Sequence, residues 1–420
     1  MAKRSQRTEG IMSDNGPKML IVGPTSGLQQ PDSGAEKVLS RIVADALAIA
    51  RDHDGADMFA RIRLGKYDLC QNDYRQIVAW SQETGKSPKE LVSVAEGVED
   101  GSIIAVSIPK EMIFQNHILK IPHLQKLISL DCKGNQLSEI NLSNIPALVL
   151  LNCEENRLAK LDLATVLALE DLICQNNQLT ELNISYLPAL TTLCCRGNKL
   201  TKLDLSNVPT LIVLDCSSNP LTQLDLSNVP ALTMLFCWRN HLTGLDLSKA
   251  TALKVLECSQ NHLIELDVPL LEELYCRQNQ LTKLDLSGAP TLTTLDCADN
   301  QLTELGLSNV PALENLNCSL NQLTKFDLSN VGTLTELNCG ANTLTKLDLS
   351  SVSALTVLSC GLNELTTLDL SNLPALTELY CEENRLIELD VRENPKLKIL
   401  KCDPWVRVIK HEWQSFSDAK

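Results

Sequence analysis

Residues 211–231 read LIVLDCSSNPLTQLDLSNVPA, and residues 232–252 repeat the pattern as LTMLFCWRNHLTGLDLSKATA. The shared unit, LxxLxCxxNxLTxLDLSNxPA, has 21 residues, and such a fixed period indicates a repeat architecture. The step shortens to 18 residues once, between Cys258 and Cys276, where a turn has lost three residues. An Asn lies three positions after every marker cysteine but the last, where Trp405 stands instead. The marker cysteines are Cys132, Cys153, Cys174, Cys195, Cys216, Cys237, Cys258, Cys276, Cys297, Cys318, Cys339, Cys360, Cys381 and Cys402.

Each unit carries two short segments of alternating hydrophobicity. Leu-x-x-Leu-x-Cys has the period-two alternation of a strand with one buried face, and Leu-Thr-x-Leu-Asp-Leu repeats that alternation on the opposite wall. Each strand should pair in parallel with the next coil, about 4.8 Å away. A single coil cannot bury its leucines, so stability must come from stacking. The sequence therefore predicts a solenoid of about 14 repeats over residues 101–402, with a curved parallel sheet and coils that are mostly strand and loop.

The unit resembles the leucine-rich repeat family, whose first half is LxxLxLxxNxL. More narrowly, it is similar to the bacterial 21-residue cysteine-ladder type found among the internalins, in which Cys replaces one core Leu. The resemblance covers about residues 124–402. It implies that the Asn side chains bond to backbone groups of the turns, as amide chemistry also suggests. It also implies that the residues between the buried ones of the first strand form a concave face that binds partners.

Most of these concave positions carry small or polar residues, such as Asp215 and Ser359. Repeat six departs from this, in a chain with only 3% aromatic residues. Aromatic residues and Arg are enriched in interface hot spots, so we predict a partner-binding patch here. The alternative is that Phe236 and Trp238 only cover neighbouring coils. The predicted partner-binding residues are Arg196, Met234, Phe236, Trp238, Arg239, Glu257, Tyr275 and Arg277.

The cysteines and histidines do not predict a metal or cofactor site. A ladder spreads its sulfurs along a line, and the sequence has no CxxC pair, so buried small hydrophobes are the favoured interpretation. Cys194 precedes the ladder residue Cys195, and alternation points it outward as a candidate surface thiol with no evident neighbouring base. His241 and His262 should stack on neighbouring coils, but two ligands make a poor metal site.

A row of aspartates marks the second strand of the unit. Ten of the thirteen LDL positions hold Asp, from Asp162 to Asp390. The alternatives are a calcium site and a solvated stripe whose carboxylates accept hydrogen bonds from nearby donors. Calcium solenoids use a GGxGxD pattern, which is absent, so the stripe is favoured.

The two ends differ from the repeats. Capping boxes and amphipathic spacing predict helices from Ser33 to Gly55, over 73–84 and from Ser87 to about Ala95, followed by a strand at 103–108. The helical region is either a cap or a separate recognition domain. At the other end, residues 405–409 read as a strand with Trp413 behind it, which closes the last coil. The predicted organisation is disorder over 1–32, a helical region over 34–100, the solenoid over 101–402, and a cap and tail over 403–420.

The net charge and the absence of catalytic motifs limit the classes of function that the sequence allows. The net charge is −15, and most of it falls on the repeats. This argues against nonspecific binding to nucleic acid or anionic lipid. The sequence has no GxSxG, P-loop, HExxH or GxGxxG motif, so no enzyme is predicted. We therefore predict a non-catalytic module that binds a protein partner on the concave face, with no cofactor. The alternative is a bacterial effector or secreted adhesin acting on host proteins.

No apolar stretch is long enough to span a membrane, and none near the N-terminus has the length of a secretory signal. The predicted location is the cytoplasm, and the alternative is export without a hydrophobic signal peptide. The partner's identity and the oligomeric state stay open.

Overall fold

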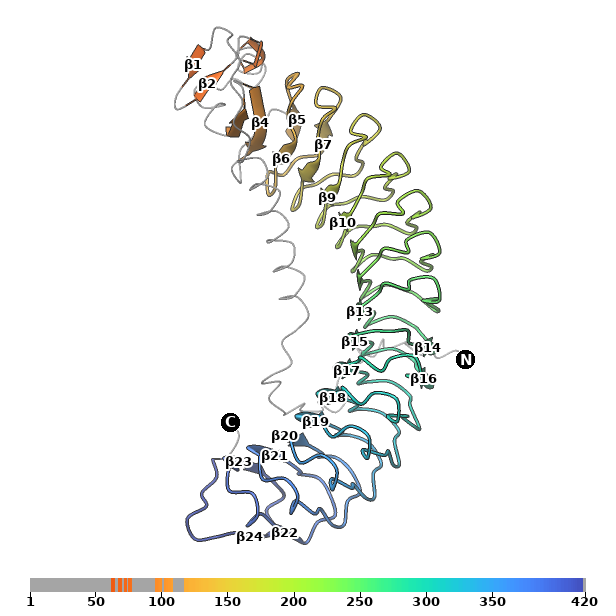
Figure 1. Cartoon of the computed structure of the whole chain (residues 1–420), viewed down its shortest axis with the longest axis vertical. Coiled ribbons are helices and arrows are strands. Elements are labelled where there is room, and N and C mark those ends of the chain that lie inside the picture. The colour runs from red at the N-terminus through yellow and green to blue at the C-terminus, as the bar shows by residue number, and fades with distance from the viewer. Residues whose placement is uncertain are drawn as a thin grey trace, which may run out of the picture.

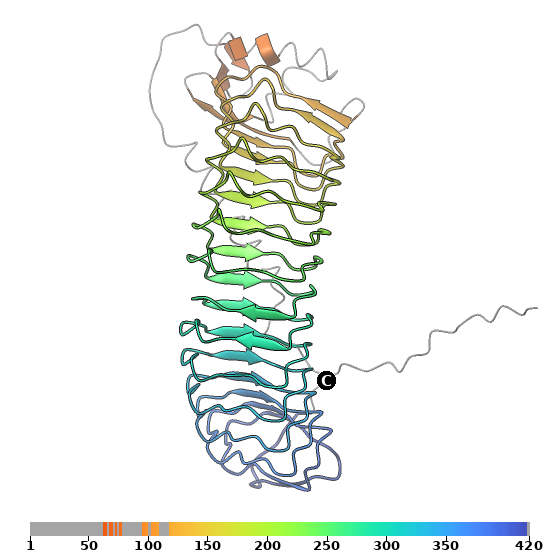
Figure 2. The ribbon, with the colours of Figure 1, turned by 90° about the vertical axis from the view of Figure 1, so that its right-hand side faces the viewer.

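The chain forms a curved stack of coils, with one continuous sheet on the inner side of the curve (Figure 1). The computed structural model describes residues 62–64, 67–69, 72–73, 75–77, 95–99, 102–108 and 117–417. Each coil contributes one three-residue strand to the inner sheet, so the strands follow one another as the rungs of a ladder (Figure 2). The predicted solenoid is confirmed.

The inner sheet has sixteen strands, and all neighbouring pairs from β4 onward are parallel. Partners differ by one repeat, as in the row Leu193, Leu214 and Leu235. From the N-terminal end the strands are β3 (Ala95–Glu99), β4 (Ser102–Ser107), β6 (Ser129–Asp131), β8 (Leu150–Asn152), β9 (Asp171–Ile173), β10 (Thr192–Cys194), β11 (Val213–Asp215), β12 (Met234–Phe236), β13 (Val255–Glu257), β15 (Glu273–Tyr275), β17 (Thr294–Asp296), β18 (Asn315–Asn317), β19 (Glu336–Asn338), β20 (Val357–Ser359), β21 (Glu378–Tyr380) and β23 (Ile399–Lys401).

The outer wall is less regular than the inner sheet. Within the described coils it forms three two-stranded parallel pairs, at the two ends and at the short repeat. These are β5 (Ile118–Lys120) with β7 (Glu139–Asn141), β14 (Glu265–Asp267) with β16 (Lys283–Asp285), and β22 (Glu388–Asp390) with β24 (Arg407–Ile409). A separate antiparallel hairpin joins β1 (Ile62–Leu64) to β2 (Tyr67–Leu69).

The core between the two walls is aliphatic. Its leucines and the ladder cysteines from Cys132 to Cys381 are buried, and Cys402 is half-buried. Full burial of one leucine contributes roughly 1.5–3 kcal/mol, and this gain recurs in every coil. All ladder cysteines are free thiols. Burial raises the pKa of Cys153 and Cys339 to about 12, so these thiols stay protonated near neutral pH. The interpretation of the ladder as buried hydrophobes is confirmed.

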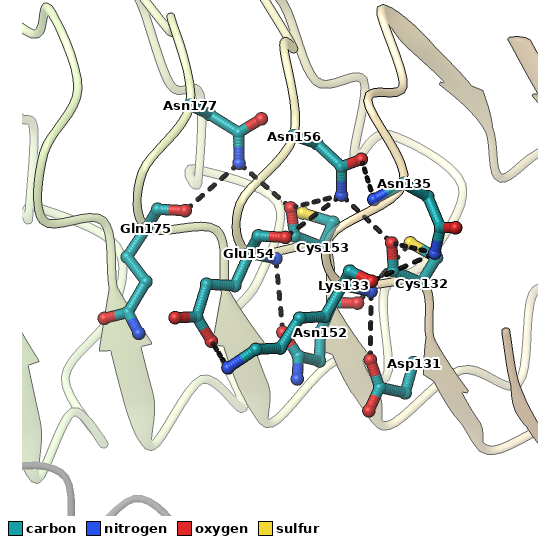
Figure 3. Close-up of polar contacts among 10 residues, drawn as sticks. All are labelled: Asp131, Cys132, Lys133, Asn135, Asn152, Cys153, Glu154, Asn156, Gln175 and Asn177. Carbon is teal, nitrogen blue, oxygen red and sulfur yellow. Dashed lines mark hydrogen bonds and ion pairs between the residues drawn. The ribbon is translucent and has the colours of Figure 1, made fainter. Parts of the chain in front are cut away.

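A ladder of buried asparagines joins the turns that follow the inner strands (Figure 3). The Nδ2 group of Asn156 donates to the carbonyl of Cys153 at 3.0 Å and to that of Cys132, one coil earlier, at 3.0 Å. Its Oδ1 accepts the backbone N–H of Leu137 at 2.8 Å. The same three contacts recur at Asn219 and at each later ladder Asn as far as Asn384. Each amide thus satisfies buried backbone groups in two coils.

The N-terminal edge of the sheet is covered by the antiparallel pair β3 and β4. The buried Asp73 accepts the backbone N–H of Ile103 at 2.7 Å, and Ile77 enters the core. The strand predicted at 103–108 corresponds to β4, and the described residues of the second predicted helix, 73 and 75–77, are helical. The strands β1, β2 and β3 were not predicted. The expectations for residues 1–32, for the helix to Gly55, for residues 78–84 of the second helix and for residues 87–94 lie outside the described residues.

At the C-terminal end Asp403 takes over from the ladder Asn. Its carboxylate accepts the backbone N–H groups of Glu383 and Asn384 at 3.0 and 3.3 Å. The buried Gln414 donates to the carbonyl of Val391 at 2.8 Å and closes the last turn. The predicted strand is present as β24. Trp413 does not pack behind it: its side chain lies on the surface, stacked on His411.

The 18-residue coil keeps its buried core although it is three residues shorter. Where a regular coil makes two consecutive turns after its outer segment, this coil makes one. Leu271 N–H donates to the carbonyl of Pro269, and both Val268 and Leu271 are buried. The following coil carries Gly288 where the units above it carry Asn207 and Asn228. A Cβ at position 288 would lie 2.6 Å from the carbonyl oxygen of Val268. Gly288 therefore lets the shortened turn approach its neighbour.

We expect Gly288→Ala to lower the free energy of unfolding by about 1–3 kcal/mol, because the new Cβ must displace backbone. Gly306→Ala is the matched control, since nothing lies within 4 Å of the Cβ position there. Urea unfolding followed by circular dichroism measures both. Equal stability of the two variants would contradict the close approach.

We expect Asn240→Ala to destabilise the protein by about 2 kcal/mol or more, because it leaves the N–H of Leu221 without a partner and removes one of the two amide donors to each of the Cys216 and Cys237 carbonyls. Asn240→Asp should also destabilise at neutral pH, since a carboxylate would face those carbonyls. The control is Asn228→Ala, at an exposed turn of the preceding coil. A loss at Asn240 no larger than at Asn228 would refute the role given to the ladder.

Candidate partner-binding surface

The last residue of each inner strand lies on the concave side, and in half of the coils it caps its own turn. In seven coils its side-chain oxygen accepts the backbone N–H two residues later, at 3.0–3.3 Å. These residues are Asp131, Asn152, Asp215, Glu257, Asp296, Asn317 and Asn338. A polar residue at this position therefore has a structural task, and its presence does not indicate a partner.

Five coils replace this capping residue with an apolar or aromatic one. The replacements are Ile173, Cys194, Phe236, Tyr275 and Tyr380. These side chains cannot cap the turn through a carboxylate or amide, so the fold itself does not require them. Four of the five lie between β9 and β15, where sequence reasoning placed its patch. Tyr380 was missed, although its place in the unit is that of Tyr275.

The eight predicted residues lie in the inner strands β10 to β15 or in the turns directly after them, and their exposure is unequal. Arg239 and Arg277 are exposed, and Arg196, Met234, Trp238 and Tyr275 are half-buried. Phe236 exposes 8% of its surface and Glu257 only 1%. Neighbouring strands hold Phe236 in register between Asp215 and Glu257. Alternation predicted the side of the sheet correctly but not the exposure of these two residues.

Arg196 and Trp238 meet across the coil that separates them. The guanidinium carbon of Arg196 lies 4.8 Å from the centre of the Trp238 ring, a cation–π contact. The intervening coil has the fully buried Ser217 at the corresponding position. A small residue in the middle coil thus allows two large side chains to form one surface.

Two tyrosines on this face are fixed by carboxylates of their own strands. The hydroxyl of Tyr275 donates to Glu273 at 3.0 Å, and that of Tyr380 donates to Glu378 at 2.9 Å. Burial and the adjacent carboxylates raise the pKa of Tyr380 to about 12 and also raise the pKa of Tyr275. Both rings therefore present a neutral, oriented phenol.

Cys194 is not the surface thiol that alternation suggested. It lies on the concave side, in register between Ile173 and Asp215, but its side chain is fully buried. It packs with Ile173 in a small apolar cluster apart from the main core. Burial raises its pKa well above the usual thiol value, so it is a poor nucleophile.

The rings of His241 and His262 stack as expected, with their centres 5.7 Å apart and their planes 2° from parallel. Across the described ranges no three His, Cys, Asp or Glu residues are grouped to hold a metal ion.

The aspartate row on the outer wall accepts hydrogen bonds, as in Asp225 with the N–H of Ser227 at 2.9 Å. These bonds lower the pKa of Asp225 although Asp204 and Asp246 oppose the shift. The solvated-stripe interpretation fits this geometry.

The chain is similar to several solved bacterial repeat proteins. The functional domain of InlJ from Listeria monocytogenes, which includes a cysteine ladder, is 32% identical, with a TM-score of 0.61, covering 78% of this chain and 76% of that one. YopM, a leucine-rich effector protein from Yersinia pestis, is 25% identical, with a TM-score of 0.61 and coverage of 80% and 99%. A leucine-rich repeat protein of Leptospira interrogans, 21% identical, has a TM-score of 0.56 and coverage of 68% and 80%.

No protein-family model matches the sequence, and no curated protein matches it. Among the residues that the structure describes, no helix has both the length and the apolar character needed to cross a bilayer.

We expect Asp296→Asn to raise the melting temperature at pH 7. Burial raises the pKa of Asp296 above its usual value, although the N–H of Ala298, Arg277 and Asn317 oppose this. A raised folded-state pKa means that ionisation costs stability as pH rises. Asn keeps the acceptor for Ala298, as Asn317 does for Ser319 in the next coil.

The gain should shrink as pH falls toward about 4 and vanish below it, where the aspartate is protonated in both states. Thermal unfolding at pH 7 and pH 3.5 checks this, with the reverse change Asn317→Asp expected to lower the melting temperature at pH 7. A difference between Asp296→Asn and the parent that is the same at both pH values would show that burial of the charge is not the cause.

Proposed function

Because the chain belongs to the leucine-rich repeat family, in its cysteine-ladder type, we propose that it is a non-catalytic interaction module that binds a protein partner on its concave face. The observation that carries the proposal is the loss of the turn-capping residue at Tyr275, whose side chain is half-buried. A repeat that gives up a hydrogen bond worth about 1 kcal/mol for an aromatic side chain needs that side chain for something other than the coil.

The centre of the proposed surface is the set Arg196, Met234, Trp238 and Tyr275, with Arg239 and Arg277 at its edge. Its large side chains are pre-oriented, Trp238 by Arg196 and Tyr275 by Glu273. Pre-orientation lowers the entropy lost on binding. Phe236 and Glu257 are not proposed as direct contacts, because little of either is exposed.

The absence of catalysis is part of the proposal. Burial keeps the pKa of each ladder thiol raised, so these thiols supply neither a nucleophile nor a metal ligand. The hydrogen bonds from Ser206 and Ser248 lower the pKa of the exposed Asp204 and Asp246 on the outer wall, which suits hydrogen-bond acceptors rather than general acids.

The proposed compartment is the cytoplasm, which the free thiols favour. The similarity to YopM, an effector protein, favours a second candidate, a bacterial effector that acts on host proteins after export. A secreted adhesin is a variant of this second candidate. Both use the same concave surface, so they differ in the source of the partner rather than in its site.

The test compares capture of proteins from lysates of the producing cell and of a host cell. Trp238→Ala, alone and with Tyr275→Ala, should weaken the affinity for the captured partner by at least about 30-fold, as expected for a hot spot worth roughly 2 kcal/mol. Circular dichroism should be unchanged, because both side chains lie outside the core.

The matched control is Trp405→Ala, which removes a tryptophan that is 65% exposed but lies beyond the inner sheet. It should leave capture intact. Unchanged affinity in the Trp238 variant, or an equal loss in the Trp405 variant, would remove the concave patch as the binding site. Capture from host lysate alone would favour the effector function.

A further inference from the structure

The strands β14 and β16 lie on the outer wall, on the side opposite the inner sheet (Figure 1). A notch interrupts this wall where the short coil begins. Its volume is about 710 Å³, and it lies between segments 243–248 and 264–269 of consecutive coils. We infer that this notch binds a short, extended segment of a partner protein in which arginine or lysine alternates with apolar residues. This site is separate from the concave patch.

The notch carries apolar side chains at positions that are polar in most coils. Ile264, which lines the notch, is 54% exposed, and Leu245, which also lines it, is half-buried. Nine of the thirteen coils carry Thr at the position of Ile264. Exposed apolar side chains gathered at a cavity indicate contact with a partner. The volume falls within the roughly 300–1,000 Å³ of sites that hold small ligands.

The notch is also acidic. Asp246, Glu265 and Asp267 line it, and all three are exposed. The strand β14 lies opposite Lys283 of β16, but within 117–417 neither Glu265 nor Asp267 is ion-paired. A cationic partner therefore has carboxylates to meet, although exposed pairs of this kind contribute little individually.

The chain itself shows which groups such carboxylates bind. The segment LIELDV at 263–268 occurs again, letter for letter, at 386–391. In that second copy Arg407 pairs with Glu388, and Arg392 pairs with Asp390 at 2.6 Å. Arg407 comes from the neighbouring strand β24, in register with Glu388. At the notch Lys283 stands in register with Glu265, as Arg407 does with Glu388, and Pro269 takes the place of Arg392. Within 117–417 Lys283 forms no ion pair with Glu265, so the two carboxylates are suited to receive guanidinium groups from another chain.

The open edge of β14 favours an extended segment. Its strand neighbour is β16, and on its other side lies the notch. A peptide that adds to a strand edge points alternate side chains to opposite sides. Alternation of apolar and cationic residues would therefore place one kind against Ile264 and Leu245 and the other near the carboxylates.

The test uses the full chain labelled with ¹³C at isoleucine δ1 methyl groups and the peptide acetyl-LRLRLR-amide. The Ile264 methyl signal should shift with peptide concentration, and the Ile387 signal should stay in place. Acetyl-LELELE-amide and acetyl-SRSRSR-amide should bind at least about tenfold more weakly, since each lacks one of the two interactions.

Fluorescence anisotropy of the labelled peptide then compares variants. Ile264→Thr, which restores the usual residue, should weaken binding roughly tenfold. Ile387→Thr, the same change in the second LIELDV segment, and Trp238→Ala should leave it unchanged. The Trp238 variant separates this site from the concave one.

Three outcomes would overturn the inference. Equal shifts of Ile264 and Ile387 would mean nonspecific attraction to the acidic wall. Equal binding of the glutamate peptide would remove the role of charge. A shift of Ile264 with protein concentration alone, without peptide, would assign the notch to a second copy of this chain.

Discussion

The buried asparagine amide is the interaction on which the remaining structure depends. The turn after each inner strand leaves carbonyl and N–H groups inside the stack, out of reach of water. One amide, with two donors and an acceptor, forms hydrogen bonds with these groups in two coils at once. It also fixes the distance between coils, so the leucines of each coil meet those of the next. The side chains on the concave surface are therefore regularly spaced from coil to coil.

The sequence predicted the periodic features well, because their physical cause is local and repeated. Leucine alternation, the ladder cysteines and the asparagines each follow from one coil's requirements. Exposure did not follow, as Phe236, Glu257 and Cys194 show. Alternation specifies which side of the strand a residue occupies, whereas exposure depends on how two neighbouring strands cover it. Asp296 and its equivalents were read only as polar surface, because a turn-capping bond depends on backbone geometry.

The residues that depart from the repeated unit give particular coils surfaces that differ from those of the other coils. A repeat in which every coil meets the same requirements has no surface that differs from its neighbours. On the inner side, Tyr275 replaces the residue that caps the turn in half of the coils. On the outer side, Ile264 replaces the Thr that most coils share. Departures of this kind can be recognised in a single sequence by aligning it with itself. The strands β1 to β3 lie outside the repeats, so self-alignment could not reveal them.

The 18-residue coil also bears on how the array assembles. Coils of equal length are interchangeable during folding, so a strand can dock against the coil after next while 21 residues loop out, and the entropy of closing such a loop is modest. Such a slip would be hard to distinguish from the native pairing by hydrophobic contacts alone. The shortened turn at Val268 fits only against a neighbour with glycine at position 288. This pair therefore acts as a register mark, which identifies one place in an otherwise uniform array.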